Sequence, residues 1–304
     1  MSDNKALVQK ILQLKKKKNA AIVAHNYQIS EIQDLADFVG DSLELSKTSM
    51  TLEANYIVFC GVRFMAETAK ILSPDKKVLL PVREAGCPLA DTITTAELLS
   101  LKKQYPDAWV VSYVNTPASI KALTDVCCTS SNAIAVVKNV PSKEIIFVPD
   151  KNLGWWVQKN VPEKRVIIWQ GSCFVHEQFN VKELAEAKKK HPDAEVLVHP
   201  ECKREVIEAA DQALSTAGML KYVKQALGKE FIIGTEEGIL HKLKKENPGK
   251  EFYSLGMAKT CINMKKTTLN ALYDSLRLDQ FEITLERDII EKAKVSLERM
   301  VQYL

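Results

Sequence analysis

The run Ala20-Ala21-Ile22-Val23-Ala24 opens the first of three similar stretches that decide the fold. Sliding the chain against itself by 88 and then by 86 residues brings Asp37 onto Asp125 and Asp211. No gap is needed from about residue 21 to residue 74. A constant register over so long a stretch indicates an internal threefold repeat.

Each copy alternates short apolar runs with stretches of helical periodicity. The apolar runs are rich in Val and Ile, which is typical of buried parallel strands. The predicted strands are residues 20–24, 56–60 and 78–81 in the first copy, 109–112, 144–148 and 166–169 in the second, and 196–198, 230–233 and 252–255 in the third. Strands that alternate with helices form right-handed crossovers. We therefore predict an α/β protein of three similar αβα sandwich domains with small parallel sheets, related by pseudo-threefold symmetry around a central active site.

The repeat also predicts the domain boundaries. We expect the first repeat, with an N-terminal helix, at residues 1–104, the second at 105–190 and the third at 191–278. Residues 279–304 are expected to be a helical extension that packs with the N-terminal region, because residues 6–14 and 288–303 both have helical periodicity.

Composition excludes several classes of protein. Of the 304 residues, 46% are hydrophobic and 26% charged, which is unlike a disordered or collagen-like chain. The 11 glycines form neither a dinucleotide-binding fingerprint nor a P-loop. A net charge of +4, spread evenly, argues against nucleic acid as a partner.

The sequence predicts a cytoplasmic protein. No apolar run approaches the roughly 18 residues that a membrane span needs, and lysines at residues 10 and 15–18 interrupt any signal peptide. Seven cysteines, an odd number without a C-x-x-C pair, argue against a disulfide framework and a zinc ribbon. We expect them to be thiols that either pack or bind metal.

Polar residues recur at equivalent places after the first strand of each copy. Ligands bind beyond the carboxyl ends of parallel strands, so these side chains are expected to share one cavity. The equivalent sets are His25, Tyr113 and His199; Tyr27, Asn115 and Glu201; and Ser42, Ser130 and Thr216. The hydroxyl set lies where helical patterns begin, which predicts a site for an anionic substrate. The alternative is that these hydroxyls only cap helices.

One cysteine per copy recurs as well. Cys87, Cys173 and Cys261 each follow the third strand, at spacings of 86 and 88. Three thiols around one axis suit an iron–sulfur cubane with one open iron, which could act as a Lewis acid. A zinc site on the same thiols is the alternative, with His176 as a possible fourth ligand, although a capping or substrate role for His176 is as plausible. The other cysteines, including the adjacent Cys127 and Cys128, do not recur and are interpreted as packing residues.

Several ordered motifs resemble those of quinolinate synthases, the A proteins of bacterial and archaeal NAD biosynthesis. They span nearly the whole chain. The motifs are residues 24–28 (AHNYQ), 40–43 (GDSL), 61–67 (GVRFMAE), 113–115 (YVN), 128–133 (CTSSNA), 199–202 (HPEC), 215–218 (STAG) and 263–266 (NMKK).

The resemblance implies a [4Fe-4S] cluster on Cys87, Cys173 and Cys261. It implies condensation of iminoaspartate with dihydroxyacetone phosphate, with loss of phosphate and two waters, to give quinolinate. A transient contact with an aspartate oxidase or dehydrogenase is a further expectation, whereas direct transfer of iminoaspartate stays open. The residues that it places in contact with substrate are His25, Ser42, Met65, Tyr113, Asn115, Ser130, Ser215 and Thr216, and the catalytic candidates are Tyr27, His199 and Glu201.

One motif departs from the family pattern. Some relatives carry C-x-x-C at the last cluster cysteine, whereas Cys261 is followed by Ile262, Asn263 and Met264. We therefore expect no redox-switched disulfide here. A non-catalytic iron–sulfur sensor remains an alternative function, weakened because no DNA-binding segment is recognisable.

Overall fold

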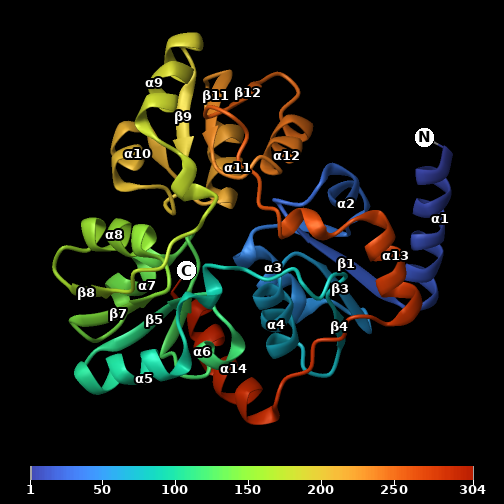
Figure 1. Ribbon diagram of the computed structural model, residues 1–304, viewed down its shortest axis with the longest axis horizontal. Coiled ribbons are helices and arrows are strands. Elements are labelled where there is room, and N and C mark those ends of the chain that lie inside the picture. The colour runs from blue at the N-terminus through green and yellow to red at the C-terminus, as the bar shows by residue number, and fades with distance from the viewer. Residues whose placement is uncertain (1, 304) are drawn as a thin grey trace.

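The protein consists of three similar lobes around a common centre, as a computed structural model describes for residues 2–303 (Figure 1). Each lobe is a four-stranded, all-parallel sheet with helices packed on it, and the three sheets share one strand order: β2-β1-β3-β4, β6-β5-β7-β8 and β10-β9-β11-β12. This confirms the predicted class of three αβα sandwiches. The domain boundaries at residues 104, 190 and 278 stay predictions.

The elements follow one another in the same order in each lobe. The first lobe has β1 (Ala20–His25), α2 (Ser30–Leu35), β2 (Phe38–Gly40), α3 (Ser42–Thr51), β3 (Tyr56–Cys60), α4 (Arg63–Leu72) and β4 (Lys77–Leu79). The second has α5 (Thr95–Gln104), β5 (Trp109–Tyr113), α6 (Ala118–Lys121), β6 (Val126–Cys128), α7 (Ala133–Asn139), β7 (Glu144–Val148), α8 (Lys151–Asn160) and β8 (Arg165–Ile168). The third has α9 (Val181–Lys190), β9 (Glu195–Val198), α10 (Arg204–Ala209), β10 (Gln212–Ala213), α11 (Thr216–Gln225), β11 (Glu230–Gly234), α12 (Ile239–Glu246) and β12 (Glu251–Ser254).

The nine strands predicted from the apolar runs are confirmed to within two residues at each end. The short edge strands β2, β6 and β10 were not predicted. They have only two or three residues each, too few to show a hydrophobic period.

The repeated aspartates hold these edge strands in place. The Oδ2 atoms of Asp37, Asp125 and Asp211 each accept a hydrogen bond of 2.8 Å from a backbone N–H of the neighbouring first strand, at Ile22, Val110 and Val196 respectively. The backbone N–H of each aspartate bonds the carbonyl of the same partner residue. A two-way contact of this kind adds to the ladder, which has only two or three residue pairs in each lobe.

The terminal helices pack differently from the prediction. Helix α1 (Ser2–Lys17) packs on α13 (Leu269–Leu278), and α14 (Arg287–Gln302) packs on α6 and β6 of the second lobe and on α4 of the first. Figure 1 shows α1 and α14 on different sides of the molecule. The reason lies in α14, whose buried Ala293, Leu297 and Met300 form a stripe that joins the core between the first two lobes.

Three short 3-10 helices, η1 (Ala90–Thr92), η2 (His176–Gln178) and η3 (Met264–Lys266), complete the elements that bear on function. Across residues 2–303, no helix has the length and apolar character needed to cross a membrane.

Candidate active site

A single cavity at the carboxyl ends of the strands draws its lining from all three lobes. It holds about 730 Å³ of atom-free space, part of which is open to solvent. Its wall includes all the predicted site residues except Ser215: His25, Tyr27, Ser42, Met65, Cys87, Tyr113, Asn115, Ser130, Cys173, His199, Glu201, Thr216 and Cys261. Residues that lie far apart in the sequence therefore meet because equivalent strands end at the same place.

Two histidines at equivalent strand ends are held in the same way. Nδ1 of His25 accepts a hydrogen bond of 3.2 Å from the backbone N–H of Tyr27, and Nδ1 of His199 accepts one of 3.3 Å from that of Glu201. A neutral imidazole whose Nδ1 accepts must carry its proton on Nε2. Nε2 of His199 lies 3.1 Å from the Ser130 hydroxyl, on the cavity wall.

Burial keeps both histidines neutral. It lowers the pKa of His25 and of His199 to about 3, although the nearby Glu201 carboxylate opposes the shift. At neutral pH each ring is therefore an uncharged Nε2–H donor rather than a cation.

The hydroxyl set lies beside helix starts without capping them. The cap of α3 is Asp41, whose Oδ1 accepts from the N–H groups of Leu43 and Glu44, and the cap of α11 is Ser215. The capping interpretation is therefore wrong for Ser42 and Thr216, which follow these caps. Their hydroxyls remain at helix N-termini on the cavity wall, where an anion is favoured.

Two further features complete this end of the cavity. The Ser131 hydroxyl lies 2.8 Å from both Asp41 Oδ2 and Ser215 Oγ, so a serine of the second lobe joins the caps of the other two. Because a carboxylate can only accept, Ser131 donates to Asp41 and accepts from Ser215. Oδ1 of Asn115 is buried with no protein partner in the described part of the chain, and it is free to accept from a ligand.

Glu201 is the centre of a buried acid–base network. Its Oε1 accepts a hydrogen bond of 2.5 Å from the Tyr113 hydroxyl, and its Oε2 lies 2.9 Å from Nδ1 of His176. Burial alone would raise the pKa of Glu201, but the facing His176 and the hydrogen bond from Tyr113 lower it below its usual range. Glu201 is therefore a carboxylate that can accept a proton.

The network continues through two residues that the sequence analysis did not assign to it. Nε2 of His176 lies 2.8 Å from the hydroxyl of Thr235, which lies 2.6 Å from the Tyr27 hydroxyl. Burial first, and then the Glu201 charge, raise the pKa of Tyr27 well above its usual value, so the phenol keeps its proton. Tyr27, Thr235 and His176 thus form a chain of polar contacts that ends 2.9 Å from Glu201. This last contact has the distance of an ion pair but does not have the geometry of a hydrogen bond.

A signal for Thr235 was present in the sequence. In the repeat register it is equivalent to Gly61 and Pro149, so only the third copy carries a hydroxyl there. The sequence analysis considered polar residues only after the first strand of each copy. Thr235 instead follows β11, which is the second of the three strands predicted for the third copy.

The three recurring cysteines have equivalent surroundings. Each is half-buried on the cavity wall, and its carbonyl accepts from the N–H four residues on, at Asp91, Glu177 and Lys265. Each sulfur also faces the backbone N–H groups two and three residues on: Leu89 and Ala90, Val175 and His176, and Asn263 and Met264. Burial raises the pKa of all three thiols, and these N–H groups only partly oppose the shift. A metal would therefore have to displace the thiol protons when it binds.

The spacing of the cysteines bears on the kind of metal. Within residues 2–303, one compact trio of possible ligands lies within 4.8 Å, and it is Cys173, His176 and Glu201, already joined by the contact between His176 and Glu201. Thiolates that share one zinc ion, with bonds of about 2.3 Å, would lie within about 4 Å of one another. The three cysteines form no such group, and they fit a larger cofactor better than a single ion.

A cavity with a buried carboxylate, a chain of polar contacts and three thiols at its wall is typical of an enzyme that acts on a small molecule. The family model described as quinolinate synthetase A protein matches residues 9–302. The chain belongs to this family.

Individual relatives agree along the full length. A quinolinate synthase of Thermodesulfovibrio yellowstonii is 54% identical over 294 residues, which cover 97% of this chain and 97% of the relative. Quinolinate synthases of Caldicellulosiruptor saccharolyticus and Methanoregula boonei are 52% and 50% identical, each over 99% of both chains. The resemblance stated from the motifs is thus confirmed at the level of the family.

Proposed function

We propose that the protein condenses iminoaspartate with dihydroxyacetone phosphate to form quinolinate, releasing phosphate and two waters. The atoms balance without an oxidant or reductant, so the reaction needs acid–base and Lewis-acid chemistry only. The observation that carries the proposal is one cavity with helix N-termini for anions at one wall and the Glu201 network at another.

The chain would bind its substrates through neutral donors. The Nε2–H groups of His25 and His199 can hydrogen-bond phosphate or carboxylate oxygens, and helices α3 and α11 add free N–H groups. We assign substrate contacts to His25, Ser42, Met65, Tyr113, Asn115, Ser130 and Thr216, with Ser215 acting through its cap and its bond to Ser131.

The proton transfers would use the network around Glu201. Glu201 is assigned as the base, because it is ionised and lies on the cavity wall. Tyr27, whose phenol is protonated, would donate to a leaving hydroxyl and be reprotonated through Thr235 and His176. His199 would orient the substrate next to Ser130.

Cys87, Cys173 and Cys261 would hold a [4Fe-4S] cluster. When bound, the cluster would supply a Lewis-acidic iron for a substrate carboxylate or hydroxyl. Its support is the equivalent N–H environment of the three sulfurs and their wide spacing. The protein would act in the reducing cytoplasm and receive iminoaspartate from an aspartate oxidase or dehydrogenase.

The test combines metal content and product. Protein purified without oxygen should be brown, contain about four irons per chain and make quinolinate from both substrates, read by mass spectrometry. Cys87→Ala, Cys173→Ala and Cys261→Ala should lose the iron, whereas the control Cys60→Ala, buried in the first lobe, should keep it. Colourless wild-type protein with one zinc, or equal iron in all four variants, would overturn the cluster assignment.

A further inference from the structure

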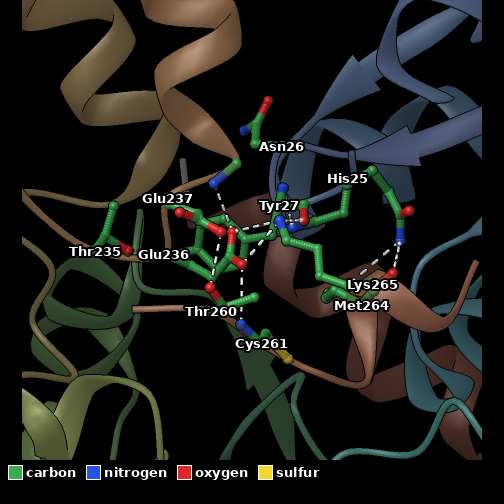
Figure 2. Close-up of polar contacts among 12 residues, drawn as sticks. His25, Asn26, Tyr27, Thr235, Glu236, Glu237, Thr260, Cys261, Met264 and Lys265 are labelled. Atoms are coloured by element: carbon green, nitrogen blue, oxygen red, sulfur yellow. Dashed lines mark hydrogen bonds and ion pairs between the residues drawn. The ribbon is translucent and has the colours of Figure 1, made fainter. Parts of the chain in front are cut away.

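The buried carboxylate of Glu236 has no role in the reaction described above. Its side chain is completely buried in the turn after β11. Oε1 accepts a hydrogen bond of 2.9 Å from the backbone N–H of Cys261, and Oε2 accepts one of 2.7 Å from that of Gly238. Glu236 is therefore hydrogen-bonded to the backbone of the cysteine itself (Figure 2).

Lys265 neutralises this carboxylate and reaches across to the first lobe. Its Nζ lies 2.9 Å from Glu236 Oε1 and 3.1 Å from Oε2. The same ammonium donates a hydrogen bond of 2.6 Å to the backbone carbonyl of Tyr27. Figure 2 shows Lys265 between the Tyr27 loop and Glu236. One cation thus joins the loop of the proton-donating tyrosine to the carboxylate that holds the cysteine.

The two lobes touch closely at this point. A Cβ on Gly238 would lie 2.8 Å from the Cα and carbonyl carbon of Tyr27, so only glycine fits there. Side-chain amides of the first lobe add two more bonds of 2.8 Å, from Gln28 to the Met264 carbonyl and from Gln33 to the Gly238 carbonyl. The contact is therefore tightly packed and polar, and its geometry depends on the charges within it.

The pair is specific to the third lobe. In the repeat register, Glu236 is equivalent to Val62 and Asp150, and Lys265 to Asp91 and Glu177. Neither of the other copies places a cation four residues after its cysteine. Asp150 also faces the backbone N–H of its cysteine, Cys173, but no lysine accompanies it. The turn therefore forms without the lysine in the second lobe, and the cation is the feature specific to the third.

We infer that Glu236 and Lys265 are positioning residues that set the Cys261 turn and the Tyr27 loop in a fixed relation to each other. The inference rests on the proposed function, in which Cys261 is a cluster ligand and Tyr27 a proton donor. Removing the ammonium leaves Glu236 buried and uncompensated, and this would release both loops together.

The experiment follows iron release under argon. Wild-type protein, Lys265→Met and the matched control Lys266→Met are mixed with a ferrous chelator. Lys266 is the exposed neighbour in the same turn, and its ammonium donates a hydrogen bond to the Glu84 carbonyl. The expected result is that Lys265→Met releases iron about tenfold to hundredfold faster than the wild type, whereas Lys266→Met matches it. Turnover per remaining cluster should also fall in Lys265→Met, because Tyr27 loses its anchor.

A second variant keeps the test valid if Lys265→Met does not fold. Glu236→Gln/Lys265→Met removes both charges, and an uncharged pair of similar volume is better tolerated than one unpaired charge. It too should release iron faster than the wild type. Wild-type kinetics in either folded variant would overturn the inference alone, whereas wild-type protein without iron would remove the proposed function and the inference together.

Discussion

The Glu201 carboxylate stays ionised although it is almost completely buried from solvent. Only 3% of the residue is exposed, and both oxygens face donors on other lobes or loops. A buried carboxylate normally gains a proton, so the arrangement of Tyr113 and His176 must offset the cost of burial. Groups held in this way are poised for proton transfer.

Glu201→Gln should keep the iron and lose the activity. The amide can still accept from Tyr113 but cannot take a proton at neutral pH, so turnover is expected to fall by ~10²–10⁴. Quinolinate formation and iron content are measured on the same anaerobic sample. Undiminished turnover would reject Glu201 as the base.

Thr235 tests the relay rather than the base. Thr235→Val removes the hydroxyl between Tyr27 and His176 and should lower turnover by ~10²–10⁴, whereas Thr235→Ser keeps a hydroxyl and should retain most of the rate. Iron content and unfolding temperature serve as controls. If the valine and serine variants turned over equally, the relay would have no role.

At the scale of elements, the edge strands depend on one side chain each. Asp125 holds β6 against β5, and β6 leads into the loop that carries Ser130. The stability of a short strand and the position of Ser130 on the cavity wall are therefore linked.

Asp125→Ala should destabilise the fold by about 1–3 kcal/mol, because the Val110 N–H loses its side-chain acceptor in a buried setting. Chemical unfolding of the cluster-free protein measures the change. Asp107→Ala, at an exposed aspartate just before β5, is the control and should be close to neutral. Equal stability of the two variants would contradict the structural role of Asp125.

The same elements show how far the sequence could predict the structure. The apolar runs predicted nine strands. The repeat register predicted, from the sequence alone, that His25, Tyr113 and His199 line one cavity. His176 and Thr235 could not be paired in that way, because they become neighbours only when the second and third lobes pack together. The partner of α14 was missed for the same reason, since an apolar stripe does not identify the surface that covers it.

On the scale of the whole molecule, α14 joins two lobes from outside the repeat. It packs on α6 and β6 of the second lobe and on α4 of the first, and the Asn132 amide donates to the Met300 carbonyl. Asn132 in turn accepts from the Thr129 N–H, next to Ser130. The last helix therefore helps to order the anion end of the cavity.

Leu297→Ala should lower the free energy of unfolding by about 2–5 kcal/mol, since it opens a cavity in the core shared by the two lobes. Val295→Ala on the same helix is the control, because Val295 is 46% exposed and should cost little. Thermal and chemical unfolding of both variants make the comparison. A Leu297→Ala protein as stable as the control would show that α14 is not part of the core.

The unlike side chains at equivalent positions of the three lobes have a stereochemical consequence. A binding site with exact threefold symmetry would hold an asymmetric ligand equally well in three orientations. Only one of these orientations could place the reacting atoms correctly. Here the ring of strand ends presents imidazole, phenol and imidazole, followed by phenol, amide and carboxylate. Because these side chains differ, the site can favour one orientation of an asymmetric ligand over the other two. For the proposed reaction, we therefore expect the regiochemistry to depend on the chemical divergence of the copies more than on their shared shape.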